Sequence, residues 1–309
     1  MSKIDIIIPC YNSHKTIDRC IGSIVMQVGS DYNITLVNDG EISYEEVINR
    51  YSSIVDIKEI SYGENKGPGF ARNYGIKNTK EDYIVFIDSD DALYSAFSLQ
   101  IMEHEIKNGD YLISGILQEQ KDNTFKIKKN NANYTHGKMY KRSFLEENNI
   151  LFKESSCCED AGFNALCSFL AHNISKTDLI TYSWMYNNNS LGRKDVLTWE
   201  RKIVPAGYVD NIIYAFNEAD KRNLDTIFLK VSFFIKIAVM YYTNVDAAPQ
   251  FKKENFYALR NYYETICRPI DNKITHKLFD AAYDSMKIEN REQNLKVLKE
   301  LMCTLKSLN

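Results

Sequence analysis

Short apolar runs alternate with amphipathic segments along the first hundred residues. Runs rich in β-branched residues predict strands, and segments with apolar positions three and four residues apart predict helices. The expected strands cover residues 4–8, 34–37, 55–60 and 83–87, and the expected helices cover residues 14–27, 44–51 and 70–77. Strands that alternate with helices are typical of a mostly parallel sheet flanked by helices. The pattern therefore predicts an α/β fold for this part of the chain.

The pattern changes twice after residue 100. The elements expected next are antiparallel strands at 111–134, a strand-to-helix corner at 138–144, a helix at 158–172 and a strand at 174–185. Beyond Trp199 several amphipathic stretches follow one another, which predicts a helical appendage. We place the boundary between 190 and 200, with an α/β domain at 1–195 and a helical domain at 196–309.

Composition and charge narrow the class of protein. The chain has 309 residues, 44% of them hydrophobic, which is typical of a folded protein and excludes a disordered or low-complexity scaffold. The formal net charge of -3 leaves no general excess of positive charge for a phosphate backbone or an anionic membrane. Nucleic-acid binding is therefore not expected.

Cysteine spacing and the apolar segments indicate the compartment. The seven cysteines show no CxxC spacing, which favours reduced thiols over a disulfide framework or a zinc site. No signal peptide is expected at the N-terminus, and the most apolar later stretch, 231–242, is too short to span a bilayer. We expect a cytoplasmic protein without a transmembrane helix.

Polar clusters follow three of the predicted strands, at 9–11, 38–40 and 88–90. In an open parallel sheet, ligands bind outside the carboxyl ends of the strands, where the loops of different units converge. We therefore expect these three clusters to open on one crevice.

Asp88-Ser89-Asp90 is the strongest of these signals. Two carboxylates separated by one residue can hold a divalent cation, and oxygen-rich sites suit Mg²⁺ or Mn²⁺. The alternative is a simple turn, since Asp and Ser are common turn and N-cap residues. We interpret the next residue, Asp91, as the cap of a following helix.

Two further segments have features of a nucleotide site. Asp39 ends a predicted strand, where a carboxylate can accept hydrogen bonds from a base or a ribose, although Asn-Asp-Gly is also a strong turn sequence. Gly67-Pro-Gly leads into a helix between Lys66 and Arg72, and helix amides and a guanidinium group suit a diphosphate. A tight connection with a solvated arginine is the alternative.

Glu159 and Asp160 lie at the start of a predicted helix. A carboxylate in the first turn often only interacts favourably with the helix dipole. In an active site, the same group can act as a general base that removes the proton of an attacking hydroxyl.

Six of these segments together resemble the family-2 glycosyltransferases with the GT-A fold. The segments are 6–12, 37–40, 67–75, 86–91, 137–145 and 159–160, and they occur in the order of that family. The resemblance covers residues 3 to about 190 and implies a Rossmann-like, mostly parallel sheet flanked by helices. The helical appendage is not covered with comparable specificity.

The resemblance implies a role for each matching position. The positions that match nucleotide-binding residues are Pro9, Tyr11, Asp39, Lys66, Gly67 and Arg72. The Asp-x-Asp motif, which holds donor and metal, corresponds to Asp88, Ser89 and Asp90, with Asp90 as the expected direct ligand of Mn²⁺ or Mg²⁺. Asp160 matches the catalytic base, and Glu159 beside it is the alternative.

The implied activity is an inverting, metal-dependent sugar transfer from a nucleotide-sugar donor, expected to be UDP-linked, to a hydroxyl group. The expected acceptor is a saccharide or a lipid-linked glycoconjugate in bacterial surface polysaccharide synthesis. A lipid-linked acceptor would bring the cytoplasmic enzyme to the inner face of the membrane. The helical domain is expected to bind the acceptor or to form homo-oligomers.

Two other functions remain open at this point. A nucleotidyltransferase also uses a Rossmann-like sheet and metal-binding carboxylates, but Pro9-Cys-Tyr-Asn12 stands where its Gly-rich signature would follow the first strand. A non-catalytic nucleotide-sugar-binding protein is less consistent with four retained carboxylates. Lys138 and Arg193 are weaker candidates for acceptor or phosphate contacts. His136 shares that interpretation, although a lone histidine before glycine is more often a loop residue.

Overall fold

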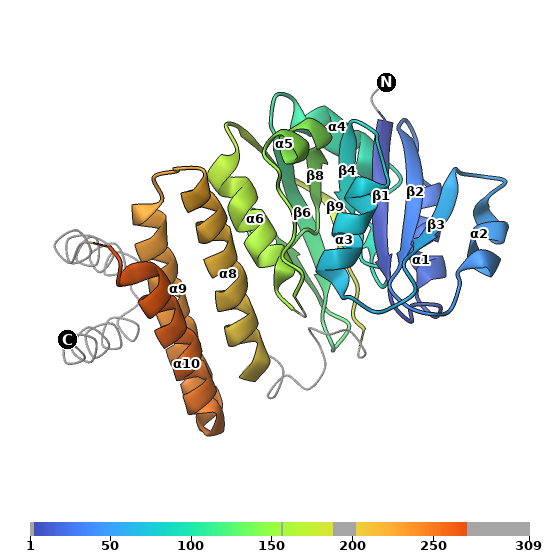
Figure 1. Cartoon of the computed structure of the whole chain (residues 1–309). Helices are drawn as coiled ribbons and strands as arrows, with labels where there is room; N and C mark the ends of the chain where they lie inside the picture. The colour runs from blue at the N-terminus through green and yellow to red at the C-terminus, as the bar shows by residue number, and fades with distance from the viewer. Residues whose placement is uncertain (1–2, 156, 188–201, 271–309) are drawn as a thin grey trace. The chain divides into compact units, whose positions relative to one another are not determined.

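The computed structural model describes residues 3–155, 157–187 and 202–270 of the chain (Figure 1). The chain divides into two compact units, Met1–Ser190 and Leu191–Asn309. The first unit is an α/β structure and the described part of the second is helical. The predicted α/β fold with a following helical part is confirmed. The assignment of functions to two domains stays a prediction.

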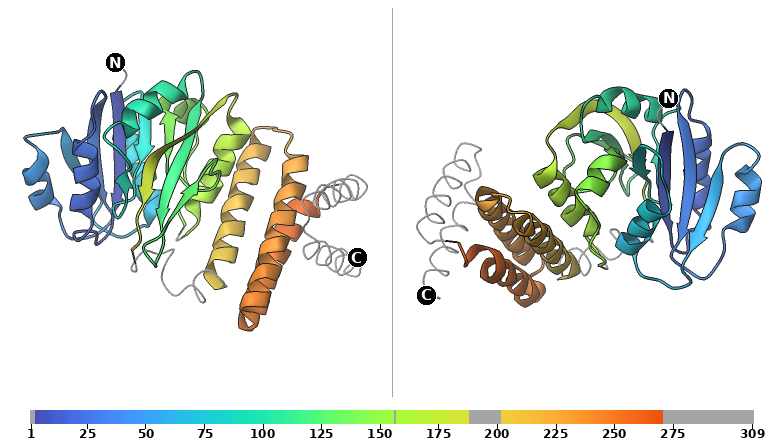
Figure 2. Two further views of the ribbon diagram at one scale, coloured as in Figure 1. Left: turned by 180° about the vertical axis from the view of Figure 1, so that it is seen from behind. Right: turned by 45° about the horizontal axis from the view of Figure 1, so that its top comes forward.

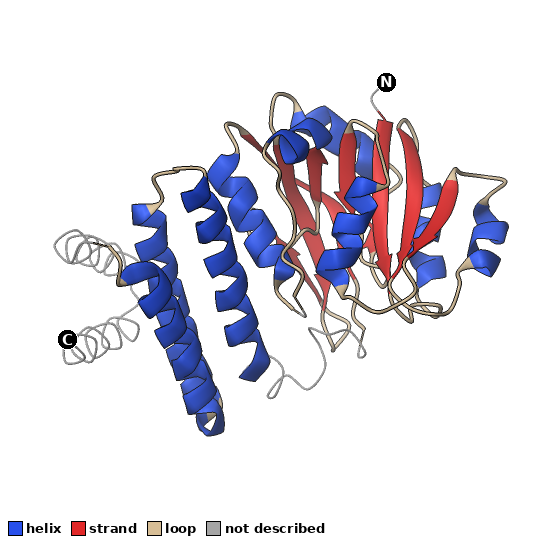
Figure 3. Ribbon diagram, in the orientation of Figure 1, coloured by secondary structure: helices blue, strands red, loops and turns tan. Residues whose placement is uncertain are grey.

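The first unit is built on one mixed nine-stranded sheet (Figure 3). Its strands are β1 Lys3–Cys10, β2 Asp31–Asn38, β3 Ile57–Ser61, β4 Tyr83–Phe86, β5 Ala92–Leu93, β6 Tyr111–Glu119, β7 Phe125–Lys128, β8 Lys138–Lys141 and β9 Ile174–Trp184. The order is β3-β2-β1-β4-β8-β6-β9-β5, with β7 paired to β6. The strands from β3 to β4 run parallel to one another, and the pairs that β8 makes are antiparallel.

The helices of this unit cover both faces of the sheet. They are α1 Ile17–Val25, α2 Glu45–Tyr51, α3 Pro68–Lys77, α4 Ser98–Ile106, α5 Arg142–Glu147 and α6 Glu159–Leu170. Helices α3, α5 and α6 lie in front of the sheet in Figure 1, and the view from behind in Figure 2 shows the opposite face, where α1 and α4 lie.

The side chains of β1 point alternately to the two faces of the sheet, and so they pack against the helices on both faces. Ile4, Ile6 and Ile8 belong to the apolar core that α1 and α4 complete, because side chains two residues apart share one face of a strand. Ile7 points to the other face, where it meets α3. A strand buried on both faces has the continuous apolar run that the sequence shows.

Glycine at position 75 allows α3 to approach β1 closely. A Cβ atom added to Gly75 would fall on Cγ2 of Ile7 and lie 3.2 Å from Cγ2 of Val37. A Cβ atom added to Gly22 of α1 would have no neighbouring atom within 4 Å. A side chain at position 75 would therefore clash with β1 and β2, whereas a side chain at position 22 would not.

The parallel register brings the polar strand ends together. Cys10 pairs with Asn38 at the ends of β1 and β2, and Phe86 at the end of β4 pairs with Ile7. The amide of Asp39 donates to the carbonyl of Cys10 at 2.8 Å. The loops after these strands thus start at one edge of the sheet, as the sequence predicts.

The described part of the second unit contains three helices, α8 Val204–Lys221, α9 Ile227–Ala247 and α10 Lys252–Tyr262, and short turns of 3₁₀- and π-helix at Pro249–Phe251 and Tyr263–Cys267. Its core contains Phe216, Phe234 and Tyr262, with Tyr262 and Phe234 stacked at 6.3 Å between ring centroids. Among the described residues, no helix combines the length and the apolar character that crossing a membrane requires.

Candidate functional site

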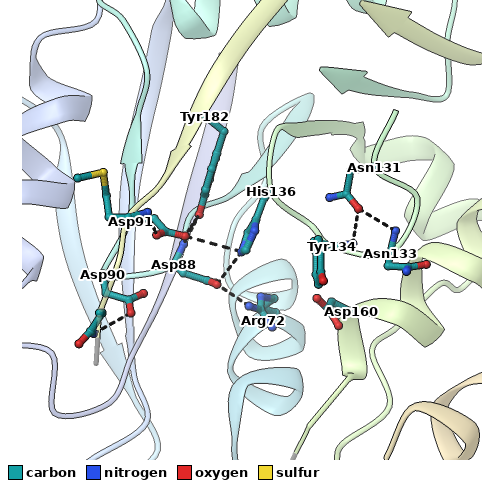
Figure 4. Close-up of polar contacts among 12 residues, drawn as sticks. Arg72, Asp88, Asp90, Asp91, Asn131, Asn133, Tyr134, His136, Asp160 and Tyr182 are labelled. Carbon is teal, nitrogen blue, oxygen red and sulfur yellow. Dashed lines mark hydrogen bonds and ion pairs between the residues drawn. The ribbon is translucent and has the colours of Figure 1, made fainter. Parts of the chain in front are cut away.

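The loop after β4 places Asp88 at the centre of a polar cluster (Figure 4). Its Oδ1 accepts a hydrogen bond from Nη2 of Arg72 at 2.7 Å, and its Oδ2 lies 2.9 Å from Nε2 of His136. Burial by itself would raise the pKa of Asp88, but Arg72 and His136 hold that pKa well below its usual range. The carboxylate therefore stays ionised between two cationic or hydrogen-bonding partners.

Asp91 is a buried member of this cluster and does not cap a helix. Its Oδ2 accepts a hydrogen bond from the Tyr182 hydroxyl at 2.7 Å, and its Oδ1 accepts one from the amide of Met185 at 2.8 Å. Helix α4 begins only at Ser98, after the short strand β5. The interpretation of Asp91 as a helix cap is therefore wrong, because its carboxylate is used to bind β9 and the residue that follows it.

One group of side chains in the described part of the chain has the geometry of a cation site. Oxygen atoms of Asp88 and Asp91 and a ring nitrogen of His136 all lie within 4.8 Å of one another. The group combines Asp88 with Asp91 and His136, whereas the sequence predicts Asp88 with Asp90. The two carboxylates are ligands that suit Mg²⁺ or Mn²⁺.

Asp90 lies beside this group. Its Oδ2 accepts a hydrogen bond from Nδ2 of Asn187 at 2.8 Å, and its backbone carbonyl accepts one from Arg19. Burial, followed by repulsion from Asp88, raises the pKa of Asp90. The pKa of Asp91 is raised well above its usual value by burial and by Asp90. The carboxylates thus repel one another, which is the electrostatic condition that a bound cation relieves.

Arg72 of α3 joins this cluster to α6. Its Nη1 donates to Oε1 of Glu159 at 2.6 Å while its Nη2 donates to Asp88, and only 5% of the Arg72 side chain is exposed. The sequence predicts a contact between Arg72 and the diphosphate. In the structure two carboxylates bind the guanidinium group and neutralise its charge inside the protein, and the contact with a diphosphate stays a prediction.

Asp160 lies next to Glu159 in the first turn of α6 and is partly buried. Burial, and then the charge of Glu159, raise the pKa of Asp160 to about 7. Figure 4 places Asp160 near Arg72 and Tyr134, on the side of α6 that faces the acidic cluster. A carboxylate with this pKa can accept a proton at neutral pH.

Asp39 organises the loop that precedes α3. Its Oδ1 accepts hydrogen bonds from the Tyr62 hydroxyl and from the amide of Lys66, both at 2.7 Å. Its Oδ2 accepts one from the amide of Gly67 at 3.0 Å. The predicted nucleotide-binding segments at 38–40 and 66–67 are therefore joined directly, through a buried carboxylate.

The other predicted donor-binding residues lie around this loop. The Tyr11 side chain is 55% exposed at the end of β1, and Pro9 and Ser89 are partly buried. Gly67 has a φ of 87°, a left-handed conformation that glycine adopts without strain. Nζ of Lys66 forms an ion pair with Glu64 at 2.7 Å.

Lys138 is buried and bonded to protein oxygens. Its Nζ donates to the carbonyls of Ala132 and Tyr134 and to Oδ1 of Asn164, and only 1% of the residue is exposed. Burial lowers the pKa of Lys138 to about 7. Protein oxygens satisfy the three donors of the ammonium group, and the contact of Lys138 with an acceptor or a phosphate stays a prediction. Arg193, the companion prediction, lies outside the described residues.

Three residues of the site are not identified by the sequence pattern: His136, Asn164 and Tyr182. His136 is a loop residue, as its place before a glycine favours, and from the loop its ring stacks on Tyr182 at 4.8 Å between centroids and contacts Asp88. The available signal for Asn164 is its spacing, since it follows Asp160 by one helical turn. No local pattern indicates Tyr182, whose hydroxyl reaches Asp91 from β9.

Comparisons with known proteins give one family. The model of "Glycosyl transferase family 2" matches residues 5–169. The uncharacterized glycosyltransferase EpsJ of Bacillus subtilis is 29% identical over 214 residues, covering 61% of this chain and 62% of the relative. A poly(ribitol-phosphate) beta-glucosyltransferase of Bacillus spizizenii is 29% identical over 263 residues, covering 75% of this chain. The chain spans 62% of the length of the first relative and 40% of the second.

Solved structures share the fold at low sequence identity. Residues 1–349 of Staphylococcus aureus TarS, in complex with UDP-GlcNAc, superpose with a TM-score of 0.72 at 17% identity, covering 98% of this chain and 92% of that one. The mannosyltransferase PcManGT of Pyrobaculum calidifontis, in complex with GDP-Man and Mn²⁺, superposes with a TM-score of 0.52 at 12% identity, covering 96% and 86%.

Proposed function

Because this chain belongs to glycosyl transferase family 2, we propose that it transfers a sugar from a nucleotide-sugar donor, UDP-linked, to a hydroxyl group of an acceptor. The single observation that supports the assignment most is the bridge that Arg72 forms between Asp88 and Glu159. The bridge joins the loop that carries the proposed metal-binding carboxylates to the helix that carries the proposed base, and this supports a reaction that needs both groups beside one anomeric carbon.

The acidic cluster fits Mn²⁺ or Mg²⁺. Asp88, Asp91 and His136 offer ligand atoms within 4.8 Å of one another, and repulsion among the carboxylates raises the pKa values of Asp90 and Asp91. We propose that Asp88 and Asp90 hold the ion, as in the Asp-x-Asp motif, with His136 beside them. A bound divalent ion supplies Lewis-acid stabilisation of the negative charge on a diphosphate leaving group.

Asp160 is the proposed catalytic base. Glu159 is held by Arg72 at 2.6 Å, whereas no guanidinium group of the described residues forms an ion pair with Asp160. In the proposed reaction, an acceptor hydroxyl attacks the anomeric carbon as the bond to the diphosphate breaks, and the hydroxyl proton passes to a carboxylate oxygen of Asp160. One displacement inverts the anomeric centre without a sugar–enzyme intermediate.

The donor is proposed to bind at the loop that Asp39 organises. The amides of Lys66 and Gly67 are fixed there by the Asp39 carboxylate, and Tyr11 is exposed on the same edge of the sheet. TarS, a structural neighbour, was solved with UDP-GlcNAc, which supports a UDP-sugar as the first donor to test.

The acceptor is proposed to be a bacterial surface polymer or a precursor of one. The name of the B. spizizenii relative specifies poly(ribitol-phosphate), which supports this class of acceptor. We propose that the described helices of the second unit serve acceptor binding or self-association.

The proposal is tested by metal-dependent hydrolysis of a panel of nucleotide sugars. We expect Mn²⁺ or Mg²⁺ to support release of a nucleoside diphosphate from at least one UDP-sugar. Asp160→Asn should keep donor binding and lose about 100-fold or more in turnover, since a general base contributes about 10²–10⁴-fold. Asp122→Asn, an exposed carboxylate in the β6–β7 turn, is the matched control.

Donor binding without turnover in the wild-type protein would favour a non-catalytic binding protein. Unchanged turnover in Asp160→Asn would instead assign the base to another group.

A further inference from the structure

Asn164, one turn after Asp160 in α6, uses its whole side chain in hydrogen bonds. Its Oδ1 accepts from Nζ of Lys138 at 2.7 Å and from the Tyr140 hydroxyl at 2.8 Å. Its Nδ2 donates to the carbonyl of Asn133 at 3.1 Å and to the carbonyl of Asp160 at 2.8 Å. A primary amide has two acceptor and two donor positions, so this buried side chain is fully satisfied.

Lys138 also donates hydrogen bonds to the loop 131–137, which contains Asn133. Its Nζ donates at 2.6 Å to the carbonyl of Tyr134 and at 3.2 Å to that of Ala132, in addition to Asn164. The segment 131–137 therefore receives hydrogen bonds from the first residue of β8 and from α6. We call Asn164 and Lys138 together the Asn164 clamp.

The loop 131–137 also contacts the acidic cluster around Asp88. His136, at the end of the loop, lies 2.9 Å from Asp88, and Arg72 connects Asp88 to Glu159 at the start of α6. The contacts thus form a closed circuit that runs from Asp88 through Arg72 to α6, and from α6 through the Asn164 clamp and His136 back to Asp88. Figure 4 shows the part of the circuit that joins Arg72, Asp88 and His136. The base and the acidic cluster are fixed relative to each other by two separate routes.

We propose that Asn164 and Lys138 are positioning residues for the transfer reaction: they bind the loop 131–137 to the first turn of α6 and so hold Asp160 at its working distance from the acidic cluster. The inference rests on the proposed function, in which Asp160 is the base. A misplacement of about 1 Å can cost about 100-fold in rate, so a clamp of this kind has a measurable kinetic effect.

Asn164→Asp separates positioning from stability. The aspartate keeps the oxygen that accepts from Lys138 and Tyr140, and it gains an ion pair with the ammonium group. Its second oxygen replaces an N–H donor and faces two carbonyl oxygens, those of Asn133 and Asp160, which repel it. The substitution therefore opens the loop-to-helix contact while the rest of the buried cluster is retained.

Lys138→Met and Arg142→Met form a matched pair. Both are buried basic residues at the two ends of β8, and both donate to backbone carbonyls. Arg142 binds Asp5, Glu81 and Ile76 at the other end of the strand, away from the circuit. Both substitutions should lower the melting temperature, but only the loss of Lys138 should release the loop.

Two measurements on the full chain decide the proposal. Hydrogen exchange of the backbone amides should become faster at 131–137 and at 159–164 in Asn164→Asp and Lys138→Met, and stay at the wild-type rate there in Arg142→Met. Metal-dependent hydrolysis of UDP-GlcNAc or UDP-glucose, whichever the wild type cleaves faster, should lose about 10- to 100-fold in kcat in the first two variants with unchanged KM. Arg142→Met should keep the kcat of its folded fraction.

Wild-type exchange at 131–137 in Asn164→Asp would overturn the inference, as would wild-type kcat in that variant or an equal kcat loss in Arg142→Met. If the wild type cleaves neither UDP-sugar, the proposed function fails for these donors. The exchange comparison then still decides whether the clamp holds the loop to α6.

Discussion

Asp160 determines the pH dependence of the proposed reaction. Its pKa is raised from 3.8 to about 7, by burial first and by Glu159 second. A base must be deprotonated to act, so kcat for donor hydrolysis should rise tenfold per pH unit below about pH 7 and level off above it. A pH–rate profile in constant saturating Mn²⁺ measures this directly. A profile that levels off near pH 4 would mean that an ordinary solvated carboxylate, or no carboxylate, is the base.

The sequence locates the carboxylates of the site but not their partners. Asp88, Asp90 and Asp160 follow a buried strand or start a helix, and these positions can be predicted from periodicity. The ion pairs of Arg72 join residues that are 16 and 87 positions apart, which no local spacing reveals. Lys138 is the first residue of β8, where the sequence allows either a solvated or a buried side chain. Only the tertiary contacts show that protein oxygens surround its ammonium group.

At the scale of elements, α3 depends on a glycine and α1 does not. Gly75→Ala should lower the free energy of unfolding by about 1–3 kcal/mol, because the new Cβ would overlap Ile7 behind the helix. Gly22→Ala should leave stability unchanged or raise it by up to about 1 kcal/mol, because the site is open and alanine favours a helix. Denaturant unfolding of both variants measures the difference. Equal effects would show that α3 can move away from β1.

Strong periodicity predicts most of the elements of the first unit. It does not predict short strands or strand ends that form only through pairing with a neighbouring strand. The predicted strand at 34–37 extends to Asp31–Asn38, since pairing with β1 and β3 continues beyond the apolar residues. Strand β5 has two residues and exists because β9 pairs with it. The sequence predicts a helix directly after Asp91, whereas α4 begins at Ser98, where Leu99, Met102 and Ile106 are buried at helical spacing.

At the scale of the whole chain, the division into two units predicts how a donor product affects unfolding. The proposed nucleotide site lies within Met1–Ser190, so UDP with Mn²⁺ should raise the melting temperature of that unit. Ligand at 100 times its Kd adds about 2.7 kcal/mol to stability. Differential scanning calorimetry should show one transition that moves and one that does not.

Asp90→Ala should remove the part of this shift that depends on Mn²⁺, because Asp90 is a proposed ligand of the ion. A single transition that moves as a whole would show that the chain unfolds as one cooperative unit. The order of the strands in the sheet, β3-β2-β1-β4-β8-β6-β9-β5, could not be predicted at this scale, since the pairing of β8 between β4 and β6 joins segments with no shared local signal.

The closed circuit through Asp88, Arg72, α6 and the loop 131–137 also bears on how substitutions in this chain combine. Residues that share partners show interaction energies, so the effects of two changes in the circuit do not add. A substitution that removes the Arg72 ion pairs leaves little for a second substitution at the same ion pairs to remove. A second substitution in the Asn164 clamp or at His136 would instead remove the remaining connection between α6 and Asp88. The tolerance of any one of these positions therefore depends on which other position has already changed, and directed evolution of donor preference would advance through paired replacements.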